Sequence, residues 1–345
     1  MNRPIRIGIN GYGRIGRCLV RALYESPLKD RFQLVGINEP SDLSTMAYLT
    51  KFDSTHGIFP GDVQEGENCL IINGETVHVD HTTDPEEIDW DHWQLDMLLE
   101  CSGKYSHRHE LERFTAQACP KVLVSHPASS AQDVDRTIVY GINQDELTGQ
   151  EILVSNASCT TNAVVPILAL LNQEYGIEHA FLTTLHSVMN DQPLIDGYHH
   201  SDLRRTRSAM QSIVPVATGL AQGIERLLPE LTRKVQAKAI RVPIVNVSAI
   251  DLMLTLKQDV DTKGLNTFLR LAASQRPGLL AYSDNPHASI DFNHNSHSAI
   301  IDGSQTHTNS GGFVNVFIWF DNEWGFANRM LDVAAAWGEK FLSDQ

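Results

Sequence analysis

The sequence predicts an α/β protein with two domains, the first built on a mainly parallel sheet and the second an α+β domain with a large, mostly antiparallel sheet. In the first part of the chain, short apolar runs alternate with stretches of helical spacing. After about residue 155 the strand-like runs become longer, and fewer helical stretches separate them. The chain has 345 residues, which is enough for two such domains.

The opening of the chain predicts a strand–helix–strand unit. Residues 5–10 form a short apolar run that ends near glycine, and 14–25 place apolar residues at helical spacing. Residues 32–38 are again typical of a buried strand. Further strands are expected at 69–79, as a hairpin around Asn73-Gly74, and at 95–101 and 121–125 with a helical stretch between them.

The second part of the chain predicts one helix, 160–174, followed by a sheet. Its expected strands are 179–188, 237–242, 245–257 and 313–320. A last helix at about 323–341 is expected to pack back on the first domain. We therefore expect a first domain at 1–155, joined by the terminal segment 323–345, and a second domain at 156–322.

Composition excludes several classes of protein. The formal net charge is -15, whereas a nucleic-acid-binding protein needs a basic face. No stretch approaches the ~20 apolar residues of a membrane-spanning helix, and the first residues do not resemble a signal peptide. The five cysteines are odd in number and widely spaced. These features predict a cytoplasmic protein with reduced thiols that binds neither nucleic acid nor membranes.

A glycine-rich turn follows the first expected strand and opens the first expected helix. Gly11, Gly13 and Gly16 form the pattern GxGxxG, which allows a tight turn, close approach of a pyrophosphate and close packing of helix on strand. Glu39 follows the second strand, where a carboxylate binds ribose hydroxyls and repels a 2′-phosphate. The context favours a Rossmann-type domain that binds NAD rather than NADP. A plain glycine turn is the alternative.

Cys159 is the candidate nucleophile. It lies in Ser-Asn-Ala-Ser-Cys-Thr-Thr-Asn, where a strand is expected to give way to a helix. The N-terminus of a helix stabilises a thiolate, and the small polar neighbours are unlike those of a core cysteine. His186 closes the expected strand 179–188 and is the candidate base, although a histidine at a strand end is more often structural.

Paired histidines also raise the question of a metal site. No further ligands complete a site beside them, so solvated or hydrogen-bonded histidines are expected and no metal is predicted. The pairs are His107/His109, His199/His200 and His294/His297.

Longer motifs resemble the phosphorylating glyceraldehyde-3-phosphate dehydrogenase superfamily. INGYGRIGR, SNASCTTN, PVATGLAQGIERLLPEL, IRVPIVNVSAIDL and FDNEWGFANRM carry this resemblance along nearly the whole chain. The resemblance implies that Cys159 attacks an aldehyde and that His186 activates the thiol. It also implies that Arg14, Ile15, Ser125 and Asn322 contact NAD. The implied substrate and phosphate contacts are Ser158, Thr160, Arg205, Thr218, Gly219 and Arg241. A homotetramer is the assembly that the family suggests.

Two departures indicate a particular branch of this superfamily. After His186, Met189 and Asp191 stand where glycolytic members have two threonines that hold the substrate phosphate. The segments DLRRTRSAMQS and DFNHNSHSAIIDG resemble the branch that oxidises erythrose 4-phosphate to 4-phosphoerythronate for vitamin B6 synthesis. Glu39 also replaces the more common aspartate. This resemblance favours water as the group that resolves a thioester on Cys159, although phosphate stays open.

Three other functions compete with this prediction. The nearest is a glycolytic enzyme that makes an acyl phosphate, against which Met189 and Asp191 argue. A binding protein that kept only the cofactor fold does not need both Cys159 and His186. A thiol hydrolase without NAD leaves the glycine turn and Glu39 unexplained.

Overall fold

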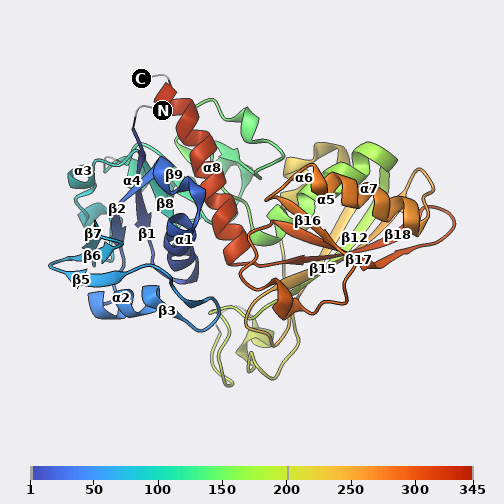
Figure 1. Ribbon diagram of the computed structural model, residues 1–345, viewed down its shortest axis with the longest axis horizontal. Coiled ribbons are helices and arrows are strands. Elements are labelled where there is room, and N and C mark those ends of the chain that lie inside the picture. The colour runs from blue at the N-terminus through green and yellow to red at the C-terminus, as the bar shows by residue number, and fades with distance from the viewer. Residues whose placement is uncertain (1–2, 118, 200–201, 344–345) are drawn as a thin grey trace. The chain divides into compact units, whose positions relative to one another are not determined.

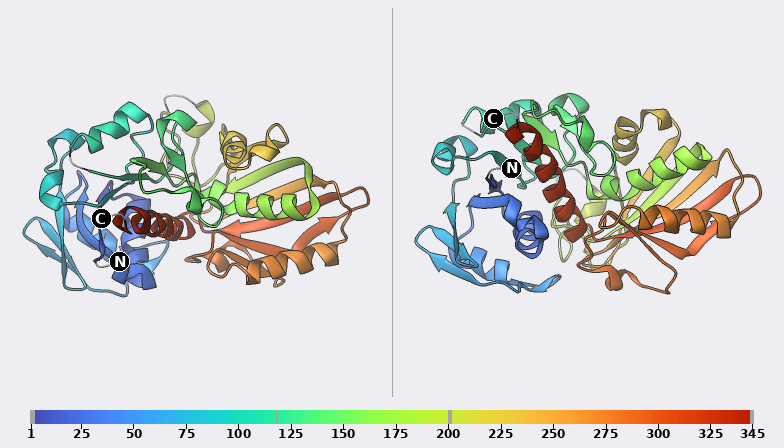
Figure 2. Two further views of the ribbon diagram at one scale, coloured as in Figure 1. Left: turned by 90° about the horizontal axis from the view of Figure 1, so that it is seen from above. Right: turned by 45° about the horizontal axis from the view of Figure 1, so that its top comes forward.

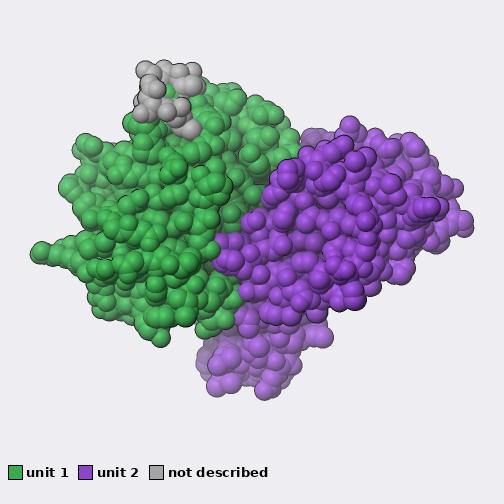
Figure 3. All heavy atoms as spheres, in the orientation of Figure 1, with its two compact units in different colours: residues 1–158, 327–345 green, residues 159–326 purple. Residues whose placement is uncertain are grey.

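The computed structural model describes residues 3–117, 119–199 and 202–343. The chain divides into two compact units, shown in green and purple in Figure 3. The first unit contains residues 1–158 and 327–345, and the second contains residues 159–326. We expected the divisions at 155 and 322, a few residues earlier in each case. His200, one of the paired histidines considered above, lies outside the described residues.

The first unit is built on a nine-stranded sheet in the order β10-β11-β9-β8-β1-β2-β7-β6-β5 (Figure 1). All the pairings from β10 to β7 are parallel, and β6 and β5 extend the sheet in antiparallel fashion. The strands are β1 (Ile5–Asn10), β2 (Phe32–Asn38), β5 (Val63–Gly66), β6 (Cys69–Ile72), β7 (Glu75–Asp80), β8 (Met97–Glu100), β9 (Val122–Val124), β10 (Arg136–Thr137) and β11 (Leu153–Ser155).

The strand order reverses at β1, because β2 lies on one side of it and β8 on the other. In an open parallel sheet, ligands bind at the carboxyl ends of the strands beside such a reversal. A small separate hairpin is made by β3 (Phe52–Asp53) and β4 (Gly57–Ile58). The helices of this unit are α1 (Arg14–Glu25), α2 (Leu43–Lys51), α3 (Trp90–Trp93), α4 (Arg108–Thr115) and most of α8 (Trp324–Ser343).

The terminal helix α8 closes the core of the first unit. A side chain added at Gly338 would come within 2.2 Å of Ile5 on β1, so the helix lies directly against this strand. Arg31, just before β2, also donates to the carboxylate of Glu339. Trp337 is fully buried. The last residues of the chain are therefore part of the same fold as the first ones (Figure 1).

The second unit has a seven-stranded mixed sheet in the order β13-β14-β12-β15-β18-β17-β16. Two pairings, β12 with β14 and β16 with β17, are parallel, and the other four are antiparallel. The strands are β12 (Ile177–His186), β13 (Val214–Val216), β14 (Val235–Arg241), β15 (Ser248–Leu256), β16 (Leu280–Ser283), β17 (Ala299–Thr308) and β18 (Phe313–Phe320).

Three helices pack on this second sheet, α5 (Cys159–Tyr175), α6 (Leu220–Leu227) and α7 (Thr262–Ser274). Their elongated arrangement along the strands is visible in both views of Figure 2. Burial alternates along β18, where Val314, Val316 and Ile318 are buried while Phe317 and Trp319 are partly exposed. One face of the sheet is therefore a closed core, and the other face keeps large apolar side chains partly open to solvent.

The expected fold class is confirmed, with a Rossmann-type sheet first and a mostly antiparallel α+β sheet second. The bounds of β1, α1, β2 and β18 agree with the sequence prediction. The predicted strand 179–188 was wrong at its end, because β12 stops at His186 and the chain then turns away. Among the described residues, no helix is both long and apolar enough to cross a membrane.

Candidate active site

The glycine turn leads from β1 into α1, and each glycine has a different environment. Gly11 has φ +88°, and a side chain there would lie 2.5 Å from the backbone of Ser102. A side chain at Gly16 would lie 2.3 Å from the carbonyl oxygen of Gly11. A Cβ at Gly13 would meet nothing within 4 Å. Packing therefore explains the first and third glycines, while the second leaves open backbone beside a helix N-terminus, as a pyrophosphate requires.

Glu39 lies beside this turn. Its carboxylate accepts a hydrogen bond from the N–H of Tyr12, at 2.8 Å, and another from the N–H of Ser41, at 3.2 Å. The side chain is half-buried at the end of β2. A carboxylate has about four lone-pair positions, so two remain for the hydroxyls of a ribose. The predicted role of Glu39 in NAD selection fits this position.

The other predicted cofactor residues of the first unit differ in how their side chains are used. Arg14 forms an ion pair with Asp53 through both guanidinium nitrogens, one of them at 3.2 Å, so its charge is directed toward protein. Ile15 is half-buried in the first turn of α1. Ser125 follows β9 and donates its N–H to the carbonyl of Glu100 at 2.9 Å. All three remain predicted contacts of NAD.

Glu100 is a buried carboxylate that the sequence analysis missed. It ends β8, has no exposed surface, and accepts hydrogen bonds from Nδ2 of Asn10 at 2.5 Å and from the N–H of Ser102 at 2.8 Å. Burial raises its pKa to about 7, although these donors oppose the shift. Asn10 in turn accepts from Nδ2 of Asn38 at 2.7 Å. A glutamate at the end of an apolar run, level with an asparagine in the next strand, was the available signal.

Cys159 is the first residue of α5, immediately after a sharp change in chain direction. Ala157 has φ +56°, an unusual value for a residue with a side chain, and is buried. The N–H of Ala157 donates to Oγ of Ser155 at 3.1 Å, which holds the turn after β11. Helix α5 therefore begins at Cys159, as the sequence analysis expected within one residue.

The thiol of Cys159 faces His186. Its Sγ lies 3.5 Å from Nε2 of His186 and 4.0 Å from Oγ1 of Thr160. Burial raises the pKa of the thiol, while Thr160 and the charge of Arg241 act in the opposite direction. The expectation that the helix N-terminus lowers this pKa below its ordinary value is wrong for the protein without ligands, because desolvation is the larger effect.

His186 and Arg241 are placed by the sheet itself. They are register partners at the carboxyl ends of the parallel strands β12 and β14. Nη1 of Arg241 lies 2.8 Å from Nδ1 of His186, and the carbonyl oxygen of Ser187 lies 2.9 Å from the same nitrogen. Burial, together with the charge of Arg241, lowers the pKa of His186 to about 4. The imidazole is therefore neutral at pH 7.

Asn322 is held by two serine hydroxyls within the second unit. Oγ of Ser187 and Oγ of Ser248 both donate to Oδ1 of Asn322, at 3.0 and 2.8 Å. The N–H of Ser187 donates to Oγ of Ser248 at 3.1 Å, which closes the network. The amide oxygen is thereby fixed, and Nδ2 provides the hydrogen-bond donors of this side chain. Such a donor suits the predicted contact with a carboxamide oxygen.

The predicted phosphate residues lie on several elements. Arg205, in a short helical turn after β12, pairs with Asp191 at 2.9 Å. Thr218 accepts from the N–H of Leu220 at 3.2 Å, and Gly219 is the residue before α6. Helix α6 packs against α5 and β14, which carry Cys159 and Arg241. Ser158 directly precedes Cys159. Printed contacts thus join Thr160 and Arg241 to the thiol–imidazole pair, whereas Arg205 is joined to Asp191.

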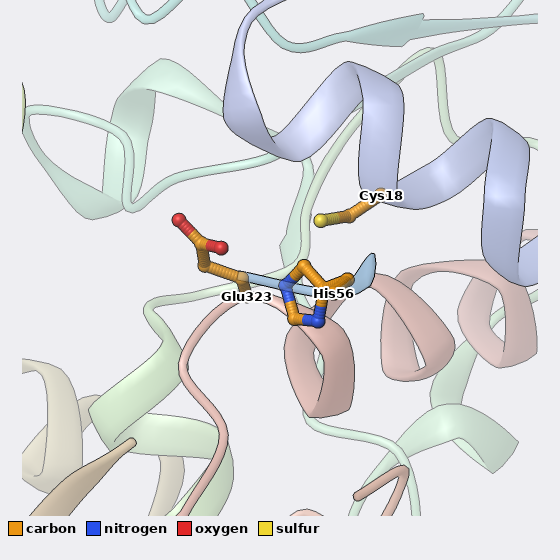
Figure 4. A group of neighbouring side chains, drawn as sticks. All are labelled: Cys18, His56 and Glu323. Carbon is orange, nitrogen blue, oxygen red and sulfur yellow. The ribbon is translucent and has the colours of Figure 1, made fainter. Parts of the chain in front are cut away.

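A metal centre is not indicated by the side chains in Figure 4. Cys18, on α1, and His56, which follows β3, both belong to the first unit, while Glu323 belongs to the second. Two protein ligands from one unit do not complete the coordination of a typical metal site. The absence of a metal stays a prediction.

These features define the class of the protein. A parallel sheet with an open glycine turn at its reversal point suits NAD, and a thiol facing an imidazole suits attack on an aldehyde carbon. The chain matches two family models, the NAD-binding domain of glyceraldehyde 3-phosphate dehydrogenase over residues 5–108 and its C-terminal domain over residues 158–322.

The chain therefore belongs to the glyceraldehyde-3-phosphate dehydrogenase superfamily and is an NAD-dependent oxidoreductase. The match to the NAD-binding domain confirms the predicted cofactor.

Proposed function

We propose that this protein oxidises D-erythrose 4-phosphate to 4-phosphoerythronate through a thioester on Cys159, as a step in the synthesis of pyridoxal 5′-phosphate. The observation that carries the proposal is the ion pair of Asp191 with Arg205, at 2.9 Å, in the segment that follows His186. A carboxylate at this position repels a phosphate instead of donating hydrogen bonds to it. The phosphate of a longer sugar would lie elsewhere, near Arg241.

The chemistry begins at the thiol. Nε2 of His186 accepts the proton of Cys159, and the thiolate attacks the aldehyde carbon to give a thiohemiacetal. The N–H of Cys159 and the imidazole stabilise the oxyanion. NAD, bound through the glycine turn and Glu39, supplies the hydride acceptor. His186 then serves as base for the water that attacks the resulting thioester and releases the acid.

The second candidate is phosphorylating oxidation of glyceraldehyde 3-phosphate, which the superfamily membership favours as much as the first. The two differ in substrate length and in the group that resolves the thioester. Met189 is half-exposed and Asp191 is paired, so neither supplies the hydroxyl donors that a glycolytic phosphate site uses. Losing a hydrogen bond to a charged group costs ~1.5–3 kcal/mol, or about tenfold or more in specificity.

Initial rates of NADH formation test this proposal. Each aldehyde, erythrose 4-phosphate and glyceraldehyde 3-phosphate, is assayed with and without inorganic phosphate. We expect a kcat/KM at least about tenfold higher for erythrose 4-phosphate, and turnover that does not need added phosphate. A tenfold preference for glyceraldehyde 3-phosphate, together with a requirement for phosphate, would establish the second candidate instead.

We also propose that the protein works as a homotetramer in the cytoplasm. Phe181 and Phe313 are about two-fifths exposed on the more open face of the second sheet, and a further copy of the chain would cover such side chains. Light scattering coupled to size exclusion tests the assembly. A monomer at micromolar concentration would contradict it.

A further inference from the structure

Two contacts of His186 are mutually exclusive. The carbonyl oxygen of Ser187, 2.9 Å from Nδ1, is an acceptor and requires a proton on this nitrogen. Nη1 of Arg241, 2.8 Å from the same Nδ1, is a donor and requires a lone pair there. A neutral imidazole carries its one proton on either Nδ1 or Nε2. His186 can therefore satisfy Ser187 or Arg241, but not both at once.

The two states have opposite consequences for the thiol. When Arg241 donates to Nδ1, the proton of the imidazole lies on Nε2, which faces Sγ of Cys159 at 3.5 Å and cannot accept a second proton without becoming charged. When Nδ1 donates to Ser187, Nε2 presents its lone pair to the thiol and can act as a base. Only the second state supports deprotonation of Cys159.

Charge formation does not remove this conflict. The groups that face His186 are Cys159 on α5, Arg241 on β14, Asp191 after β12 and Glu323 before α8. Burial is the largest influence on the imidazole, and the pKa of about 4 keeps it neutral near pH 7. The choice is therefore between two neutral tautomers. Arg241 decides it, because the register of β12 with β14 holds this side chain beside His186.

Arg241 is also suited to leave that position when an anion is present. Its guanidinium is partly buried, and burial lowers its pKa, which means that its charge is incompletely solvated. The nearest carboxylate, Asp191, is already paired with Arg205. Nη1 of Arg241 is 3.4 Å from the carbonyl of Ser187, so a small displacement from Nδ1 keeps a protein acceptor within reach. A phosphate provides the planar guanidinium with a stronger partner than imidazole.

We propose that Arg241 is a positioning residue that holds His186 in the inactive tautomer until a phosphate group draws it away. The proton then moves through solvent from Nε2 to Nδ1, where Ser187 accepts its hydrogen bond, and Nε2 becomes the base for Cys159. Activation of the thiol is thus coupled to the presence of a phosphate. This inference rests on the proposed function, because it assumes a phosphosugar substrate.

The tautomer of His186 is measured directly by long-range ¹H–¹⁵N correlation spectra of NAD-loaded, ¹⁵N-histidine-labelled protein. A His186→Asn variant assigns the signal. We expect Nε2–H without added anion and Nδ1–H with saturating glycerol 3-phosphate, a phosphate monoester without an aldehyde. A parallel titration with inorganic phosphate distinguishes a site for free phosphate from one for the ester. Nδ1–H under every condition would overturn the proposal.

The reactivity of Cys159 toward iodoacetamide, an uncharged reagent, gives an independent test at pH 7. In Arg241→Leu we expect alkylation about tenfold faster than in the parent without phosphate, and no further response to phosphate. Arg207→Leu is the matched control, since Arg207 pairs with Asp196 at the surface and should leave the parent's behaviour unchanged. If Arg241 served only to attract the thiolate by its charge, its removal would slow alkylation, and this outcome would contradict the switch.

The two proposals fail in different ways. A protein that does not oxidise phosphosugars, but whose His186 still changes tautomer with phosphate, would refute the proposed function and retain the switch. A protein that oxidises erythrose 4-phosphate with an unchanged tautomer would do the reverse.

Discussion

The two units both use the carboxyl ends of parallel strands, but for different purposes. In the first unit, Asn10 and Asn38 end β1 and β2, Glu100 ends β8, and these side chains bind one another. In the second unit, His186 and Arg241 end β12 and β14 and carry the chemistry. Buried polar groups shape the backbone in one unit and position reactive atoms in the other. The cofactor site therefore depends on main-chain conformation, and the thiol site depends on individual side chains.

Replacing the nucleophile should separate the two units most completely. Cys159→Ser is expected to reduce kcat by roughly 10⁴-fold or more, because a hydroxyl does not replace the thiolate. NAD affinity, measured by calorimetry, should be unchanged, since the glycine turn is untouched. Cys69→Ser, the same substitution on β6 of the first unit, is the control and should remain active. Substantial turnover in Cys159→Ser would refute the covalent mechanism.

Loss of the base should have a somewhat smaller effect. We expect His186→Asn to lower kcat/KM by about 10²–10⁴-fold, the usual contribution of a positioned acid–base group. His179→Asn removes an exposed imidazole from the same strand and should have no effect on the rate. Equal rates in His186→Asn and the parent would show that the thiol is activated by another group.

The buried carboxylate of the first unit should make stability depend on pH. The pKa of Glu100 is about 7 in the fold and 4.5 in an unstructured chain, so the folded state retains a proton that the unfolded chain has released. Stability should therefore fall as pH rises from about 4.5 to about 7 and change little from this source above it. The fully buried group corresponds to roughly 3 kcal/mol.

Urea unfolding across this pH range, followed by tryptophan fluorescence, measures the effect. Glu100→Gln, which does not ionise, should lose this part of the pH dependence. The exposed Glu67→Gln should retain it. Parallel pH profiles for Glu100→Gln and the parent would show that Glu100 does not carry this titration.

The smallest effect concerns cofactor choice. Glu39→Ser should narrow the preference for NAD over NADP by roughly tenfold, the equivalent of about 1.4 kcal/mol, because repulsion of the 2′-phosphate is relieved. The substitution also removes the acceptor of the Tyr12 N–H, so affinity for NAD should fall slightly. The ratio of kcat/KM for the two cofactors is the measurement. Equal use of both by the parent would contradict the assignment of Glu39.

Local patterns predicted much of the first unit. The bounds of β1 and α1 were predictable because a glycine turn separates an apolar run from a helical one. Strand β17 and helices α6 and α7 were not foreseen as elements, since mixed polar and apolar residues conceal their periods. The pairing of His186 with Arg241 depends on the register of two strands that are distant in sequence, which no local pattern specifies.

The acid–base properties of the site were harder to predict than its members. Cys159 and His186 were identifiable from their neighbours, but the rise in the pKa of the thiol and the fall in that of the imidazole come from burial. Burial results from the packing of the whole unit. Similarly, Arg205 was expected as a phosphate ligand, and only the folded chain brings Asp191 beside it.

The position of α8 has a consequence for how the protein is made. Its residues from Ala327 onward complete the first unit, and Gly338 lies against Ile5 on the strand at the centre of that sheet. Domains usually fold in order as the chain leaves the ribosome. Here the first domain to be synthesised lacks one wall of its core until translation has passed the whole second domain. During that interval the apolar surface beneath α8 is open to solvent, and the nascent chain is most exposed to aggregation and to chaperones.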